Sequence, residues 1–208
     1  MNTTEPTSTR TLGRKARALL AGGLVLGVGA AITLAVWNDS EFATGTFTSG
    51  HFNMLGSVDG TTFTNHPSGT PGALSFSVGF DNLAPDEVTS APFVVHLDAD
   101  TTTDAVVSVN SAGVSGTAAA DLTYGIRQVA SVVACTPTTT AGTVIVPAGT
   151  LLSSVTGAST FDLPMSVDGI VVGADAFLCI QVTGSSTLEQ DTTATGTWEL
   201  LATSTPAV

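Results

Sequence analysis

The sequence predicts an all-β domain, a jelly-roll or Greek-key β-sandwich, preceded by a single N-terminal apolar helix. From about residue 44 onward, short apolar runs alternate with clusters of Gly, Pro, Asp, Asn and Ser, and no stretch shows helical periodicity. Many short strands at this spacing are typical of a sandwich. The first 36 residues instead combine a basic cluster with an unbroken apolar stretch. Without them, 172 of the 208 residues remain, enough for the core of one domain.

Residues 1–36 have the pattern of an export signal. The n-region, residues 1–17, ends in Arg14-Lys15-Ala16-Arg17, and residues 18–36 form an apolar core without a charge. Positive charge is costly to move across a bilayer, so the N-terminus stays in the cytoplasm and the rest of the chain is exported. We therefore expect a secreted or cell-surface protein that begins with an export helix.

The junction after the apolar core is a predicted cleavage site. Thr33-Leu34-Ala35 supplies the small-x-small pattern that a signal peptidase accepts, which places cleavage at Ala35, Val36 and Trp37. Nineteen apolar residues can also span a bilayer permanently, although four glycines weaken this segment as a membrane helix. The membrane is therefore contacted only if the signal stays uncleaved.

The predicted strands follow from alternation and turn chemistry. The clearest is residues 74–80, where Leu74, Phe76, Val78 and Phe80 share one face. Turns are predicted at Asp59-Gly60, Asp81-Asn82, 111–113 and Asp168-Gly169. Further strands are expected at residues 93–97, 105–109, 122–129, 143–146, 177–182 and 195–201.

The charge of the exported part excludes several partners. Of the five basic residues only Arg127 lies beyond residue 36, whereas 16 of the 17 acidic residues do, a formal net charge of −15. Such a surface repels nucleic acid and anionic headgroups. The two cysteines, Cys135 and Cys179, are expected to form one disulfide in an oxidising exterior, and the alternative is two buried thiols.

No catalytic constellation is recognisable. The three histidines, His51, His66 and His96, have no metal-ligand spacing, and no nucleophile or phosphate-binding motif occurs. We expect no enzyme and no cofactor. One incomplete calcium loop is a metal candidate: Asp98, Asp100 and Asp104 stand at positions 1, 3 and 7, but the loop lacks the glycine and the bidentate glutamate. A solvated acidic loop is the alternative.

The export region resembles a known family. The cluster at residues 14–17, the Gly/Ala/Leu core and the run from Thr33 to Phe42, with its aromatic–Asn–Asp–Ser exit at residues 37–40, resemble the signals of SipW-type alternate signal-mediated exported proteins. This superfamily includes TasA-like biofilm-matrix proteins and camelysin-like proteins. Asn82-Leu83-Ala84-Pro85-Asp86-Glu87 and residues 195–200 resemble the family more weakly, and residues 113–175 match nothing in it.

The resemblance implies a jelly-roll sandwich over residues 53–208 and processing by an alternate signal peptidase. It also implies that the mature N-terminal segment, residues 37–52, inserts as a donor strand into a neighbouring subunit, with Phe42, Phe47 and Phe52 in the acceptor groove. The same segment could instead fold back as the first strand of its own domain. The expected function is that of a non-enzymatic surface or matrix fibre subunit. A monomeric binding module or adhesin, and a camelysin-like protease, are the alternatives.

Overall fold

A computed structural model of the chain describes residues 13, 15–24, 40–77 and 80–205. Within the predicted export helix, residues 13 and 15–24 are helical, and no described helix is long and apolar enough to cross a membrane. The predicted cleavage residues Ala35, Val36 and Trp37 lie outside the described residues. The chain divides into two units, Met1–Phe47 and Thr48–Val208.

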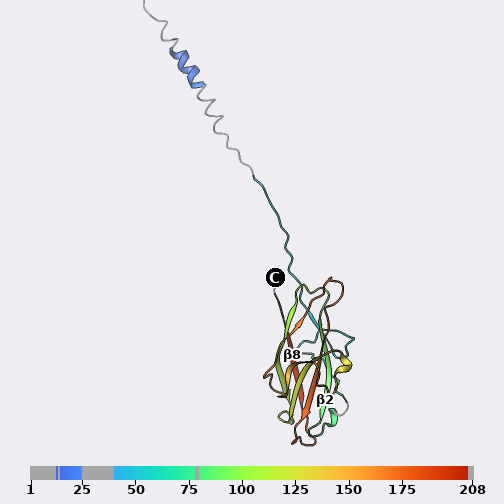
Figure 1. Cartoon of the computed structure of the whole chain (residues 1–208). Helices are drawn as coiled ribbons and strands as arrows, with labels where there is room; N and C mark the ends of the chain where they lie inside the picture. The colour runs from blue at the N-terminus through green and yellow to red at the C-terminus, as the bar shows by residue number, and fades with distance from the viewer. Residues whose placement is uncertain (1–12, 14, 25–39, 78–79, 206–208) are drawn as a thin grey trace, which may run out of the picture. The chain divides into compact units, whose positions relative to one another are not determined.

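The second unit is an all-β sandwich of two antiparallel sheets, as the sequence predicts (Figure 1). The five-stranded sheet has the order β1-β2-β7-β4-β5, and the three-stranded sheet has the order β6-β3-β8. Their bounds are β1 Met54–Ser57, β2 Val88–Leu97, β3 Ala105–Ser115, β4 Leu122–Val129, β5 Thr143–Leu151, β6 Phe161–Leu163, β7 Ala176–Gly184 and β8 Thr195–Ser204. Two short 3-10 helices, η1 (Phe80–Asn82) and η2 (Val132–Ala134), complete the described elements.

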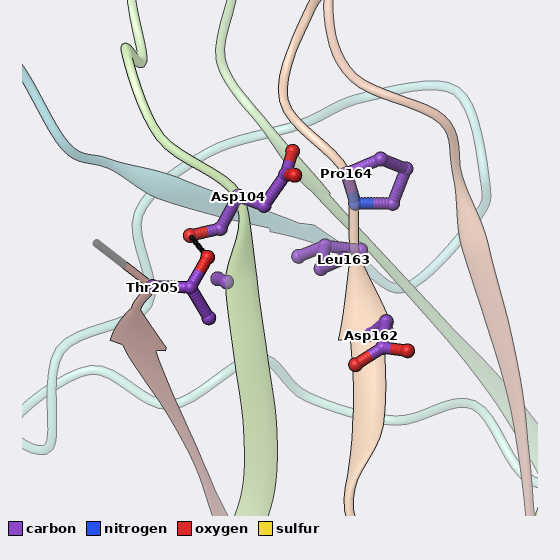
Figure 2. A pocket seen from close by; sticks show the side chains of 6 residues that line it. Asp104, Asp162, Leu163, Pro164 and Thr205 are labelled. Carbon is purple, nitrogen blue, oxygen red and sulfur yellow. Dashed lines mark hydrogen bonds between the residues drawn. The ribbon is translucent and has the colours of Figure 1, made fainter. Parts of the chain in front are cut away.

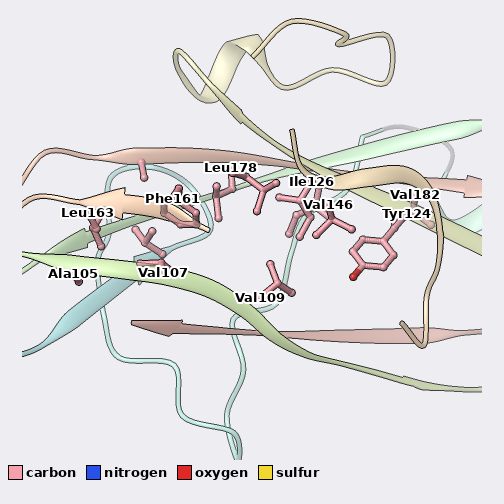
Figure 3. Packing of buried hydrophobic residues seen from close by; sticks show 14 of the residues in the cluster. Ala105, Val107, Val109, Tyr124, Ile126, Val146, Phe161, Leu163, Leu178 and Val182 are labelled. Carbon is pink, nitrogen blue, oxygen red and sulfur yellow. The ribbon is translucent and has the colours of Figure 1, made fainter. Parts of the chain in front are cut away.

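The core lies between the two sheets (Figure 3). Alternate residues of neighbouring strands meet there because side chains of a strand point to opposite faces in turn. Tyr124 and Ile126 of β4, Leu178 of β7, and Val107 and Val109 of β3 are all buried in this cluster. The Tyr124 hydroxyl is satisfied by donating to the carbonyl oxygen of Ser154 at 2.7 Å.

Strand β2 is buried on both faces over its second half. All four residues from Val94 to Leu97 are buried, which simple alternation does not predict. The outer face is covered by the chain that follows β1: the Phe63 ring stacks on His96 with centroids 3.9 Å apart. The five-stranded sheet is thus shielded on this outer side by loop and η2 segments.

The predicted strand at residues 74–80 is wrong. Residues 74–77 have no regular structure, Val78 and Gly79 lie outside the described residues, and Phe80 begins η1. The alternation nevertheless reports burial, since Leu74 and Phe76 pack against the core. Ser77 is held to β2 by a hydrogen bond from its N–H to the Ser90 carbonyl at 2.8 Å and by one that its hydroxyl accepts from the Ser90 N–H at 3.1 Å, but residues 74–77 do not form a strand.

The predicted disulfide is confirmed. Cys135 and Cys179 are bonded across a sequence separation of 44 residues, which ties the segment after η2 to the middle of β7. The Gln181 side chain reinforces this link, because its Nε2 donates to the carbonyl oxygens of Thr136, Pro137 and Thr139 at 3.0 to 3.1 Å. The segment is therefore anchored covalently and by hydrogen bonds.

Candidate assembly site

The most unusual feature of the sandwich is the outer edge of β8. This strand pairs with β3 along its whole length, from Thr195 opposite Ser115 to Ser204 opposite Ala105. It is the last strand of its sheet, so in the described part of the chain no strand pairs with its second edge. An edge ten residues long presents a row of backbone donors and acceptors that can pair with another strand.

The inward face of β8 is incompletely covered. Trp198, Leu200 and Ala202 pack against the core but stay only partly buried, while Val107 and Val109 of the adjacent β3 are buried. Trp198 still contacts the core, its ring lying 5.5 Å from that of Tyr124 between centroids. The inward side chains of β8 are therefore less fully covered than Val107 and Val109 of β3.

Little on β8 itself discourages pairing. Natural edge strands are commonly protected by charge or proline, and the only charged residue of β8 is Glu199, which accepts a hydrogen bond from the Asn110 side chain at 2.9 Å. The alternation of half-buried and exposed residues runs unbroken from Thr195 to Thr203. This regular, almost uncharged edge is suited to accept a strand.

The candidate donor segment is exposed where the structure describes it. Residues 40–50 have no regular secondary structure, and Phe42 and Phe47 are each 95% exposed. Phe52 belongs to the second unit and is also exposed, next to the bridge between His51 and Thr101. Residues 40–50 therefore form no strand in the described part of the chain, whereas His51, near the end of the segment, forms a parallel bridge with Thr101 of its own domain.

The candidate calcium loop does not gather its carboxylates. Asp98 is engaged by the Thr101 hydroxyl (2.7 Å), the Asn53 amide (3.0 Å) and His51 Nε2 (3.0 Å). Burial acts to raise the pKa of Asp98, but these hydrogen bonds outweigh it and hold the pKa below its usual value. Nowhere in the described residues do three or more His, Cys, Asp or Glu side chains lie together as metal ligands.

Asp104 lies apart from Asp98, at a hollow of about 240 Å³ beside the ends of β3 and β6 (Figure 2). Its Oδ1 accepts the Met165 N–H at 2.8 Å, and its carbonyl oxygen accepts the Thr205 hydroxyl at 3.1 Å. Asp162 lines the same hollow. Asp104 thus fixes the start of the loop that follows β6.

A second His–Asp pair, His96 and Asp175, lies where the imidazole is packed inside the domain. His96 Nδ1 lies 2.9 Å from Asp175 Oδ1, and the imidazole is almost wholly buried beneath Phe63. Its Nε2 is buried and has no hydrogen-bond partner within the described part of the chain. The pair therefore holds no hydroxyl or thiol that it could activate.

Together these features define an all-β sandwich with an open sheet edge and an exposed aromatic segment. No protein-family model matches the chain, and no curated protein is significantly similar to it in sequence.

The sequence predicts the aromatic segment but not the open edge of β8. Residues 195–201 alternate between apolar and polar side chains, as any half-buried strand does, whether or not its second edge is paired. The one available signal was the mixture of large and small inward residues, Gly196, Trp198, Leu200 and Ala202.

Proposed function

We propose that this chain is an exported, non-enzymatic protein of the cell surface or extracellular matrix whose copies assemble into fibres by strand donation. The mature N-terminal segment of one copy, residues 37–52, adds beside β8 of the next. The observation that carries the proposal is the open edge of β8, where the inward side chains are only partly buried. Main-chain hydrogen bonds supply affinity in such strand addition, and pockets for alternate side chains supply specificity.

The order of the strands in the two sheets supports the proposal, because it matches a jelly roll in all but one position. In an eight-stranded jelly roll, strands numbered along the chain pair as 2-7-4-5 in one sheet and as 1-8-3-6 in the other. Here the first sheet contains β2-β7-β4-β5, and the second contains β8-β3-β6. The strand that would occupy position 1, β1, pairs with β2 instead. We infer a jelly roll whose first position, beside β8, is left for a strand from elsewhere.

The spacing of the aromatic residues sets how the donor would bind. Side chains of a regular strand alternate between faces, so Phe42 and Phe47 would point to opposite faces of the donor. Phe52 would share the face of Phe42 only if the bridge between His51 and Thr101 opened to free the end of the segment. One set fills the half-open core beside Trp198 and Leu200, and the other covers the outer face of the sheet. The two sets therefore make different contributions to assembly, which substitution can separate.

Export by a SipW-type alternate signal peptidase is the second part of the proposal. It is supported by the basic cluster, the apolar core and the aromatic–Asn–Asp–Ser exit at residues 37–40. The disulfide between Cys135 and Cys179 is compatible with an oxidising exterior. Cleavage at Ala35, Val36 and Trp37 releases the donor segment at the new N-terminus, so export and competence to assemble arise together.

The test compares the mature chain that starts at Trp37 with a chain that starts at His51, by electron microscopy and light scattering. We expect filaments from the first and monomers from the second. The acceptor is tested with two neighbouring leucines: Leu200→Thr, on the inward face, should weaken assembly more strongly than Leu201→Thr, on the outward face. Equal filament formation without residues 37–50, or equal effects of the two leucine variants, contradicts strand donation. A mature chain that stays monomeric supports the binding-module alternative.

A further inference from the structure

The loop between β6 and β7, residues 164–173, presents large apolar side chains to solvent; we call it the apolar loop. Val167 is 96% exposed and Ile170 is 80% exposed. Met165, Val171 and Val172 are exposed as well. Contiguous apolar exposure of this kind marks an interaction site, whereas single exposed apolar residues are ordinary.

The apolar loop is held in a defined conformation by a hydrogen-bonded turn. The Ser166 hydroxyl donates to Asp168 Oδ1 at 3.0 Å and accepts the Gly169 N–H at 3.0 Å. The same carboxylate oxygen accepts the N–H groups of Ile170 (2.9 Å) and Val171 (3.2 Å). The apolar side chains are therefore displayed on a pre-organised frame, which lowers the entropic cost of binding.

A second turn in the same chain shows that this frame does not require apolar residues. Residues 57–60 repeat the sequence Ser-Val-Asp-Gly of residues 166–169. There the Ser57 hydroxyl donates to Asp59 Oδ1 at 2.8 Å, and the same oxygen accepts the two following N–H groups at 2.8 Å each. Those two groups belong to Thr61 and Thr62, where the apolar loop has Ile and Val. The turn alone thus gives no reason for Ile170 and Val171.

The two turns also differ in how closely the rest of the domain packs against them. A Cβ added at Gly60 would lie 2.6 Å from Cγ2 of Val132, because η2 packs on the first turn. A Cβ added at Gly169 would meet nothing within 4 Å. The more polar turn is covered by the described domain, and the more apolar turn is left open.

The apolar loop lies at the end of the sandwich from which the chain leaves towards its N-terminus. Gly173, which closes the loop, donates its N–H to the Leu97 carbonyl at 2.9 Å. The next residue, Asp98, donates its N–H to the carbonyl oxygen of Asn53 at 3.1 Å. Residues 40–50 precede this point and extend to about 40 Å at most. A subunit that receives the donor strand therefore lies close to this end.

We propose that the apolar loop is a contact surface for a second copy of this chain, packing on the subunit that receives the donor strand. This rests on the strand-donation function proposed above. With one basic side chain, Arg127, against 16 acidic residues beyond residue 36, ion pairs can contribute little to a contact between two copies, so uncharged groups must supply most of it. The same charge disfavours an anionic lipid surface as the occupant.

The test replaces Ile170 and Val171 with threonine in the mature chain, copying the first turn so that its hydrogen bonds are retained. Val133→Thr, at an 87% exposed position on η2, is the matched control. We expect the critical concentration for filaments to rise about 10- to 100-fold in the double variant, as for loss of two buried apolar side chains. The control variant should assemble as the wild type does.

The outcomes separate this inference from the proposed function. Filaments that need residues 37–50 but form at an unchanged critical concentration in the double variant overturn the apolar-loop contact and leave strand donation standing. A wild-type mature chain that forms no filaments overturns both. Sedimentation with vesicles of anionic or zwitterionic phospholipid that depends on Ile170 and Val171 would assign the loop to a lipid surface and also overturn the inference.

Discussion

Removal of the disulfide should cost the domain about 4 kcal/mol of unfolding free energy. The perturbation is the pair Cys135→Ala and Cys179→Ala. The bond closes a loop with a sequence separation of 44 residues, and the loss of loop-closure entropy from the unfolded chain gives roughly 4 kcal/mol at 25 °C for that length. In the folded variant the Gln181 side chain still donates to three backbone carbonyls of the same segment. We therefore expect the folded loop to keep its place and the effect to arise in the unfolded state.

The assay is urea denaturation of the oxidised chain that starts at His51, compared with the double alanine variant. The midpoint should fall and the m value should rise, because the unfolded variant exposes more surface. Gln181→Ala is a useful companion, since it leaves the disulfide intact and removes only hydrogen bonds. A loss below about 1 kcal/mol with an unchanged m value would refute the entropic reasoning.

Two further predictions concern the turns. The N–H groups of Thr62 and Thr61 and the Ser57 hydroxyl lower the pKa of Asp59 well below its usual value of 3.8; its contribution to stability is present above pH 4 and should be lost as the pH falls below it. The difference between wild type and Asp59→Asn in urea midpoints from pH 6 to pH 2 should shrink accordingly, and parallel curves would contradict this. Gly116→Ala should destabilise the domain by about 2 kcal/mol or more, measured by thermal unfolding, because φ is 104° and the new Cβ would lie 2.2 Å from the Thr193 carbonyl oxygen.

The strands that the sequence predicted correctly are those in which alternation coincides with cross-strand pairing. Residues 177–182 fall in β7, the central strand of the five-stranded sheet, and residues 122–129 fall in its neighbour β4, with which it pairs in register. Their inward residues in the core, within 122–129 and 177–182, are large and apolar, so local pattern and tertiary burial agree. The sequence therefore sufficed for the middle of the five-stranded sheet.

Where the sequence predicts the wrong secondary structure, contacts with other parts of the chain determine the structure that forms. Residues 111–113 were a predicted turn, but β3 continues through them to Ser115 with a register shift between Val109 and Ser111. The residue skipped at this shift is Asn110, a residue type that also favours turns. Residues 74–77 alternate well yet have no regular secondary structure. Composition does not distinguish these cases, because the difference lies in the neighbouring chain.

The candidate assembly site also has one part that the sequence predicts and one part that it does not. The aromatic donor segment was visible because Phe42 and Phe47 stand in a polar stretch without partners of their own. The acceptor was not, since an open edge is a property of strand order, and nothing in residues 195–204 records that β1 pairs with β2 instead of β8. Likewise, the two Ser-Val-Asp-Gly turns are indistinguishable until the structure shows that Val132 covers only the first.

The negative charge of the domain affects how its open edge at β8 can associate with other copies. Copies that each carry a formal charge of −15 repel, so random association through exposed edges is suppressed at low ionic strength. In the proposed strand donation, main-chain hydrogen bonds and buried aromatic side chains would have to overcome that repulsion, and neither needs a cation. Under that proposal, the near absence of basic residues beyond residue 36 would disfavour ion-paired association and leave strand addition as the favoured contact between copies.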